Sequence, residues 1–172
     1  LIVDKIDTNE LIKSYNEIFS HTAQDRGLEF KVIDNIKGTF YNDKDRLGQV
    51  IRNLISNAFK FTKDGSVTLE ISHTNDLKLP IKVCVTDTGM GIPKEKQELI
   101  FKAFTQADGS TSRQFGGTGL GLSISTELSH LMKGDIELYS EVGQGSSFCI
   151  LLPNLKDDFN DEQVTLKTKN IK

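Results

Sequence analysis

The first third of the chain has apolar residues at helical spacing, preceded by a short polar stretch. The apolar set recurs every three or four residues and predicts an amphipathic helix. Its members are Leu11, Ile12, Tyr15, Ile18 and Phe19. Asp7-Thr8-Asn9-Glu10 has the form of a capping box, so the helix is expected to begin there and to stop near Gly27. Residues 1–6 are expected to be either a short strand or the exit of an incoming helix.

Two strands and a second helix are expected next. Residues 28–34 alternate between apolar and polar positions, and residues 38–41 form a second short strand-like run. Helical spacing then returns and predicts a helix from Asn42 or Asp43 to about Thr62. Its apolar stripe consists of Leu47, Ile51, Leu54, Ala58 and Phe61.

The second half combines paired strands with one long irregular stretch. Residues 67–72 and 81–87 alternate and are expected to be sheet neighbours. Residues 88–118 are rich in glycine, serine and threonine, with only a short helical patch near residues 95–101. A loop of that length often forms a functional lid. A further helix and two strands are expected near residues 120–132, 136–140 and 147–152.

The domain boundaries follow from length and composition. A chain of 172 residues with 37% hydrophobic content fits one α/β domain, expected to span residues 7–153. Residues 154–172 are polar and charged and are expected to form a tail or linker. No apolar run approaches the roughly 20 residues that span a bilayer. Because the sequence opens at Leu1 within an apolar and charged stretch, the chain is expected to be a fragment of a longer polypeptide.

Charge and cysteine content exclude two classes of site. A net charge of −3 and a pI near 5.6 argue against nucleic acid as a partner, because its capture needs clustered basic residues. Cys84 and Cys149 lie in apolar, β-branched runs without metal-ligand spacing. Both are expected to be buried thiols, which is compatible with a reducing cytosol.

Three polar residues share one face of the predicted helix over residues 43–62. Asn53, Asn57 and Lys60 are four and three residues apart and lie off the apolar stripe. Amide oxygens can enter the shell of a hard cation, and a lysine ammonium suits a phosphate oxygen. Together they suit a magnesium nucleotide, although ordinary polar residues on a solvated helix face would show the same spacing.

An aspartate is expected on the core side of the strand over residues 81–87. Ile81, Val83 and Val85 share one side of that strand, and the same parity carries Asp87 inward. A carboxylate there is costly unless a donor such as an adenine amino group binds it. Gly89 and Gly91 follow and let the backbone approach a flat ligand. An Asp-Gly turn closing a hairpin is the alternative.

A glycine-rich segment at residues 116–122 precedes the last predicted helix. Free backbone N–H groups and the helix dipole can hold phosphates at such a helix start. The segment does not directly follow a strand, as a dinucleotide fold requires, and it lacks the lysine of a phosphate loop. Both of those alternatives therefore fit poorly.

Taken in order, these segments resemble the sequence boxes of sensor histidine kinases. Residues 45–62 resemble the asparagine box, residues 87–91 the first glycine box, residues 101–104 the phenylalanine box and residues 117–121 the second glycine box. The resemblance covers about residues 7–152. It implies an α+β fold, a two-layer α/β sandwich with a mixed, mostly antiparallel sheet and helices on one face. This Bergerat-type ATP-binding fold is shared with gyrase, Hsp90 and MutL ATPases.

The resemblance also implies roles for residues of the asparagine box, with ATP and Mg²⁺ as cofactors. Asn57 would coordinate magnesium, with Asn53 helping at the metal or the phosphates. Lys60 would contact phosphate, and Phe61 would line the nucleotide pocket. Asn53 and Lys60 are catalytic candidates together with Arg113, which would reach the terminal phosphate from the lid.

The glycine boxes complete the implied nucleotide site. Asp87 would read adenine. The other residues assigned to the pocket and the phosphate tail are Gly89, Gly91, Ile92, Gly117, Thr118, Gly119, Leu120 and Gly121. Phe101 and Phe104 would anchor the lid by packing, and core aromatics describe them equally well.

The expected reaction is transfer of the γ-phosphate of ATP to a histidine in two-component signal transduction. Related ATPases have a glutamate where Asn53 stands, and an asparagine cannot accept a proton from water. None of His21, His73 and His130 lies in an acceptor-like sequence, so the acceptor is expected on upstream dimerisation helices outside the chain. A regulatory nucleotide-binding module and an ATP-hydrolysing relative are the alternatives.

The resemblance further implies partners and a location. It implies a response regulator receiver domain as a partner and a homodimer for the full-length protein. The domain is expected in the cytoplasm, and anchoring of the full-length protein in the inner membrane is left open.

Overall fold

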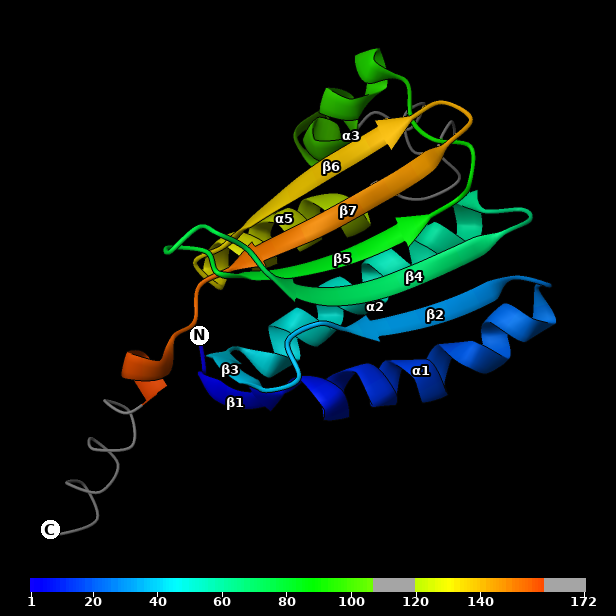
Figure 1. The fold of residues 1–172 in the computed structure, drawn as a ribbon. Helices are drawn as coiled ribbons and strands as arrows, with labels where there is room; N and C mark the ends of the chain where they lie inside the picture. Colours follow the sequence, from blue (N-terminus) through cyan, green and yellow to red (C-terminus); the bar gives the residue numbers. More distant parts are fainter. Residues whose placement is uncertain (107–119, 160–172) are drawn as a thin grey trace, which may run out of the picture.

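A five-stranded sheet organises the domain in the computed structural model, which describes residues 1–106 and 120–159 (Figure 1). The strand order is β2-β4-β5-β7-β6, with β2 parallel to β4 and the other pairs antiparallel. The strands are β2 (Glu29–Asp34), β4 (Ser66–His73), β5 (Ile81–Asp87), β6 (Asp135–Glu141) and β7 (Gly145–Leu152). The predicted pairing of β4 with β5 is confirmed.

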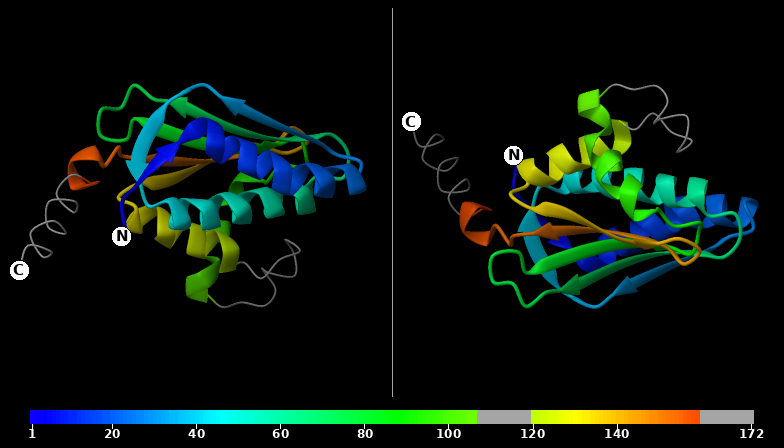
Figure 2. Two further views of the ribbon diagram at one scale, coloured as in Figure 1. Left: turned by 90° about the horizontal axis from the view of Figure 1, so that it is seen from below. Right: turned by 90° about the horizontal axis from the view of Figure 1, so that it is seen from above.

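The helices lie on one face of this sheet, and the other face is left uncovered by them (Figures 1 and 2). They are α1 (Thr8–Asp25), α2 (Lys44–Phe61), α3 (Lys94–Gln106) and α5 (Leu120–Leu131). Helix α1 packs along β2, α2 packs on β4 and β5, and α5 packs on β6 and β7. Strands β1 (Asp4–Asp7) and β3 (Thr39–Asn42) form a separate antiparallel pair. The expected two-layer sandwich is therefore confirmed.

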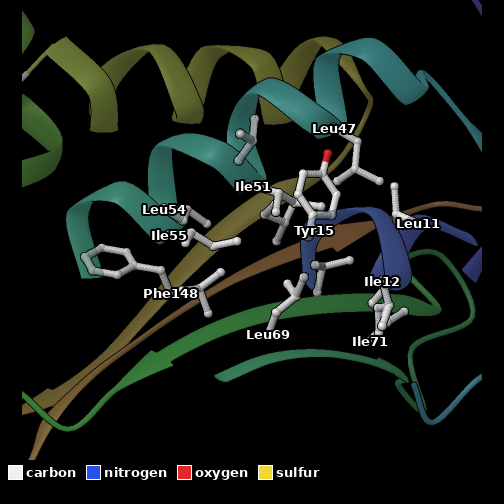
Figure 3. Close-up of a cluster of buried hydrophobic side chains, with 14 of the residues drawn as sticks. Leu11, Ile12, Tyr15, Leu47, Ile51, Leu54, Ile55, Leu69, Ile71 and Phe148 are labelled. Carbon is white, nitrogen blue, oxygen red and sulfur yellow. The ribbon is translucent and has the colours of Figure 1, made fainter. Parts of the chain in front are cut away.

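The core fills the space between the sheet and helices α1 and α2 (Figure 3). Alternation along β5 turns Ile81, Val83 and Val85 inward, and each is almost fully buried. The predicted stripe of α2 is buried from Leu47 to Ala58. Phe61, the last residue of α2, is the exception and is only half-buried.

The two ends of the chain take part in the fold. Residues 4–7 form β1, so of the two alternatives for the first residues, a strand or the exit of a helix, the structure shows the strand. At the other end Leu155 donates from its N–H to the carbonyl of Tyr41 at 2.8 Å, and the rings of Tyr41 and Phe159 lie 5.0 Å apart. The first residues of the expected tail thus pack on β3. Within the described residues, no helix has the length and hydropathy needed to span a bilayer.

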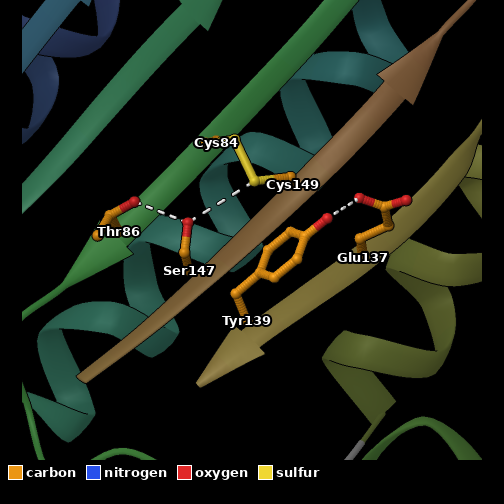
Figure 4. The surroundings of a disulfide bond; sticks show 6 residues. All are labelled: Cys84, Thr86, Glu137, Tyr139, Ser147 and Cys149. Carbon is orange, nitrogen blue, oxygen red and sulfur yellow. Dashed lines mark hydrogen bonds between the residues drawn. A yellow bond between two sulfur atoms is a disulfide. The ribbon is translucent and has the colours of Figure 1, made fainter. Parts of the chain in front are cut away.

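The two cysteines are joined, so the expectation of two buried thiols is wrong. Cys84 of β5 lies directly opposite Cys149 of β7, with their Cα atoms 4.1 Å apart, and the pair forms a disulfide (Figure 4). Because Val83 and Val85 point inward, Cys84 points to the uncovered face and is only half-buried. The pairing was not visible in the sequence because β5 and β7 are 65 residues apart at these cysteines.

The capping box before α1 provides a local stability test. The side chain of Asp7 accepts a hydrogen bond from the backbone N–H of Glu10 at 3.0 Å. Asp7→Ala is expected to lower the free energy of unfolding by about 1 kcal/mol, because this helix N–H loses its partner. Urea unfolding of the oxidised chain measures it. Asp25→Ala, at the other end of α1, removes a carboxylate beside the negative helix end and should cost less than half as much. Equal losses would contradict the capping role.

Candidate functional site

The second half of α2 carries the predicted metal and phosphate residues. Asn53 and Asn57 are half-buried and Lys60 is exposed, whereas the opposite side of α2 is buried in the core. Helix α2 ends at Phe61, since Thr62 adopts an extended conformation at its C-cap. The amides therefore lie at the edge of the core, where a ligand can reach them.

The start of α5 lies beside this part of α2. A Cβ built on Gly121 would be 3.9 Å from Nδ2 of Asn57. That distance is an ordinary van der Waals contact, and helices α2 and α5 touch along this region, so the asparagine amide lies against the first turn of α5. The asparagine box and the last residue of the second glycine box are thus brought together, as the sequence predicts.

Asp87 ends β5 on the core side of the sheet, as its parity predicts. It is 5% exposed, and its Oδ1 accepts from the backbone N–H of Gly89 at 2.9 Å and of Ser146 at 3.3 Å. Among the described residues, no group donates a hydrogen bond to the other oxygen, Oδ2. The carboxylate is therefore held through one oxygen and keeps acceptor capacity on the other.

The glycines after Asp87 are required by the protein's own backbone. A Cβ on Gly89 would clash with the carbonyl of Phe61, and one on Gly91 would clash with the carbonyl of Glu141. Gly91 also has a φ of +72°, which favours glycine. The end of α2, the segment after β5 and the β6–β7 turn consequently meet at this point. Ile92 is fixed there by a hydrogen bond from its N–H to Oγ of Ser140 at 2.8 Å.

Sequence reasoning missed two residues at this junction. Ser146 supports Asp87 through its N–H, and its hydroxyl lies 2.8 Å from Oγ of Ser140. Two glycines before Ser146 indicate a turn in the sequence. That turn can be connected to Asp87 only when the pairing of β5 with β7 is known. Thr62 was also missed. Its buried hydroxyl has no hydrogen-bond partner among the described residues, beside the site at the end of α2.

Several predicted residues cannot be placed at the site. Arg113, Gly117, Thr118 and Gly119 lie outside the described residues. Leu120 is the first residue of α5, and the side chains of Leu120 and Phe104 are outside the described part. The ring of Phe101 packs edge-on against Phe148 with centroids 6.2 Å apart. That contact supports the description of Phe101 as a core aromatic.

Burial changes the acidity of Asp87. Burial raises its pKa above the usual 3.8, and the hydrogen bonds from Gly89 and Ser146 oppose that rise without cancelling it. Between pH 3.8 and the raised pKa, the folded chain holds a proton that the unfolded chain releases. The contribution of Asp87 to the free energy of unfolding therefore falls as pH rises through that window, and it is constant above the window.

The Asp87→Asn variant should reveal this linkage. An asparagine Oδ1 can accept the same two N–H groups but does not titrate. The free energy of unfolding of the variant, relative to the parent, is therefore expected to increase as pH rises from 3.8 through the raised pKa. Urea unfolding at a series of pH values measures the difference. A flat difference, or one of opposite slope, would contradict the assigned shift.

The donor set fits magnesium only with a nucleotide. The described residues contain no group of three His, Cys, Asp or Glu side chains that could hold a metal. Magnesium is commonly bound by few protein oxygens together with substrate phosphates. The amide oxygens of Asn53 and Asn57, on one half-buried helix face, match that arrangement. The metal would therefore enter with the phosphates of its nucleotide.

Sequence comparisons connect this geometry to known proteins. Residues 42–156 match the family described as histidine kinase-, DNA gyrase B-, and HSP90-like ATPase. The chain is 41% identical to hybrid signal transduction histidine kinase L of Dictyostelium discoideum over 86% of its length, which is 9% of that protein. It is 40% identical to the histidine-protein kinase BarA of Escherichia coli, over 76% of this chain and 15% of BarA. The chain thus spans a small fraction of these relatives.

Solved structures agree with the sequence match. The full-length ShkA structure in complex with AMPPNP superposes with a TM-score of 0.76 at 32% identity, covering 89% of this chain and 31% of ShkA. The nucleotide-free catalytic domain of histidine kinase ThkA gives 0.74 at 25% identity, covering 90% of this chain and 99% of that one. The chain therefore belongs to the histidine kinase-, DNA gyrase B- and HSP90-like ATPase family, and within it to the catalytic domains of sensor histidine kinases.

Proposed function

We propose that this domain binds Mg·ATP and transfers the γ-phosphate to a histidine on a dimerisation helix outside the chain. The observation that carries the proposal is the meeting of the end of α2, the buried Asp87 and the start of α5. Membership of the family supports the nucleotide, and the kinase relatives support the reaction class.

Asp87 reads the adenine ring in this proposal. Its ionised Oδ2 accepts a hydrogen bond from the 6-amino group of adenine, while the N–H groups of Gly89 and Ser146 hold Oδ1. A hydrogen bond to a charged acceptor contributes about 1.5–3 kcal/mol. The buried carboxylate, which is costly in the free domain, gains a further donor when adenine binds.

The residues of α2 hold the phosphate end. Asn57, with Asn53 beside it, offers amide oxygens to magnesium, and the exposed ammonium of Lys60 is long enough to contact a phosphate oxygen. Bound magnesium would neutralise phosphate charge and orient the γ-phosphate. Phosphoryl transfer depends mainly on such positioning and charge stabilisation. Arg113 and residues 117–120 are assigned to the terminal phosphate by the family resemblance alone.

Asn53 favours transfer to an external nucleophile over hydrolysis. Hydrolysing members of the superfamily resemble one another in having a glutamate at this position, and a neutral amide cannot act as general base for water. A histidine on a partner helix brings its own nucleophilic nitrogen. The acceptor helices and a receiver domain of a response regulator are accordingly the proposed partners, in a cytoplasmic, homodimeric parent protein.

Two measurements test the proposal in sequence. Calorimetric titration of the chain with AMPPNP, with and without magnesium, should show tighter binding when the metal is present. Incubation with radiolabelled ATP and a separately produced dimerisation-helix domain should then label that domain, and should not label this chain alone.

The alternatives predict other outcomes. A regulatory nucleotide-binding module would bind AMPPNP but leave the acceptor domain unlabelled. A hydrolase would release phosphate at the same rate with or without the acceptor. Failure to bind any adenine nucleotide would overturn the proposal at its first step.

A further inference from the structure

The disulfide between Cys84 and Cys149 lies on the sheet face that the helices leave uncovered (Figures 1 and 4). We propose that it is a reversible two-electron site, reduced by dithiols, and that its reduction weakens nucleotide binding at Asp87. The first half of this proposal stands on the disulfide alone. The second half rests on the proposed function.

Exposure selects the sulfur that a reductant attacks. Cys84 is half-buried, whereas Cys149 is only 1% exposed. Thr86, the next residue of β5 on the same face, is exposed, so the approach along β5 is open. Exposed disulfides are the more reducible class, whereas enclosed ones tend to be structural. A dithiol is therefore expected to attack Sγ of Cys84.

A hydroxyl pair stabilises the departing sulfur. Oγ of Ser147 lies 3.6 Å from Sγ of Cys149, and a disulfide sulfur carries no hydrogen, so Ser147 is the donor (Figure 4). The hydroxyl of Thr86 then donates to Oγ of Ser147 at 2.8 Å. This donor favours negative charge on Cys149. Since a better-stabilised thiolate leaves faster, exposure and hydrogen bonding select the same direction of attack.

The exchange balances with one dithiol molecule. A thiolate of the reductant forms a bond to Sγ of Cys84, the disulfide breaks, and Cys149 leaves with the electron pair and takes a proton from water. The second thiolate of the reductant then attacks its own sulfur in the mixed disulfide, and Cys84 leaves and is protonated. The protein gains two electrons and two protons, and the dithiol becomes a cyclic disulfide.

The broken bond changes the spacing of β5 and β7. Two sulfurs that are no longer bonded separate to about 3.5–4 Å, the range of non-bonded contact. The cysteines are directly opposite with Cα atoms only 4.1 Å apart, so their side chains or the strands must move. Directly opposite residues of an unbridged antiparallel pair have Cα atoms about 4.5 to 5.5 Å apart, so strand movement is the favoured response and reduction lets the two central strands relax apart at this position.

The same pair of strands supports Asp87. Asp87 is three residues after Cys84, Ser146 is three residues before Cys149, and the two lie opposite each other in the register. The hydrogen bond from the N–H of Ser146 to Asp87 is already 3.3 Å long. Widening of the strand pair lengthens it further, which makes the buried carboxylate costlier and less able to bind adenine.

The proposed location agrees with reversible chemistry. Disulfides in reducing compartments are mostly transient and sense redox state, whereas structural disulfides belong to oxidising compartments. A cytoplasmic domain with this bond would therefore alternate between two states.

The test measures thiols and affinity on the same folded chain. Under native conditions, dithiothreitol should convert the disulfide to two thiols, counted by alkylation and mass spectrometry. Affinity for Mg·AMPPNP should then fall about fivefold, at the lower end of allosteric coupling. By reciprocity, saturating Mg·AMPPNP should make reduction harder by the same factor. The variant with both Cys84→Ser and Cys149→Ser should bind with an affinity that dithiothreitol does not change.

Two serine variants test the direction of attack. Ser147→Ala should slow reduction, because the departing Cys149 loses its donor. Ser72→Ala, on the same face of β4, should leave the rate unchanged. Equal rates in both variants would overturn the role of Ser147.

The remaining outcomes separate the two halves of the proposal. Thiols that appear only when urea unfolds the chain would overturn the reversible site. Full reduction with unchanged affinity would overturn the coupling and leave the proposed function standing. If neither the oxidised nor the reduced chain bound AMPPNP, the proposed function would be overturned, and the coupling with it. The count of thiols would still decide whether the disulfide is a reversible site.

Discussion

Replacement of Asp87 by asparagine is expected to weaken ATP binding roughly 30- to 100-fold while leaving the domain folded. The variant keeps an Oδ1 for the N–H groups of Gly89 and Ser146, which hold the parent carboxylate at 2.9 and 3.3 Å. Its second atom is an NH₂ group, which cannot accept from the 6-amino group of adenine. Calorimetric titration with Mg·AMPPNP measures the loss.

A comparison of two nucleotides makes this prediction specific. Inosine triphosphate has an oxygen in place of the 6-amino group, so it should already bind the parent chain weakly. The affinity for inosine triphosphate should fall little further in Asp87→Asn. The change in the nucleotide and the change in the protein are then far from additive, which appears as a large coupling energy in a double-mutant cycle. Asp157→Asn, at an exposed site in the C-terminal segment, should change neither affinity. Equal losses for both nucleotides would show that Asp87 supports the fold and does not read adenine.

Asn57→Ala is expected to lower phosphotransfer to a separately produced acceptor domain about 100- to 1000-fold, the usual cost of removing one preorganised charge-stabilising group. The half-buried amide beside Gly121 is the proposed oxygen ligand for magnesium, and alanine offers none. The rate of acceptor labelling under single-turnover conditions measures the effect. The gain in AMPPNP affinity that magnesium provides should also disappear.

A neighbouring residue of the same helix controls for this substitution. Ser56→Ala removes a polar group one position away, on an exposed part of α2, and should leave labelling within twofold. Affinity for AMPPNP without magnesium should be similar in Asn57→Ala and in the parent. If Asn57→Ala kept the magnesium-dependent gain, the metal would have other ligands.

Local patterns were sufficient for most elements and for the placement of the α2 amides and of Asp87. Spacing predicted α2 and its polar face, and strand parity predicted that Asp87 turns inward, because both depend on one element only. The capping box before α1 is equally local, because it joins Asp7 to Glu10. The family resemblance then assigned roles to side chains that the helix pattern alone left open.

Features that depend on distant pairing were not predicted. The disulfide and the support of Asp87 by Ser146 both arise from the register of β5 with β7, and alternation does not specify which strands pair. The assignment of Gly89 and Gly91 to the ligand stays a prediction, and the structure adds a requirement that the sequence did not reveal: their lack of a Cβ makes room for the carbonyls of Phe61 and Glu141. Backbone crossings of this kind cannot be recognised before the topology is known.

Helix α2 has its hydrophobic side in the core and its amide side at the proposed nucleotide site. A helix moves as a rigid unit, so a shift that repacks Ile51 or Leu54 also displaces Asn53 and Asn57 at the edge of the core. Substitutions in the interior of this domain should therefore alter catalysis without touching the substrate. The rate of the proposed phosphotransfer would then depend on the size of residues that no nucleotide contacts.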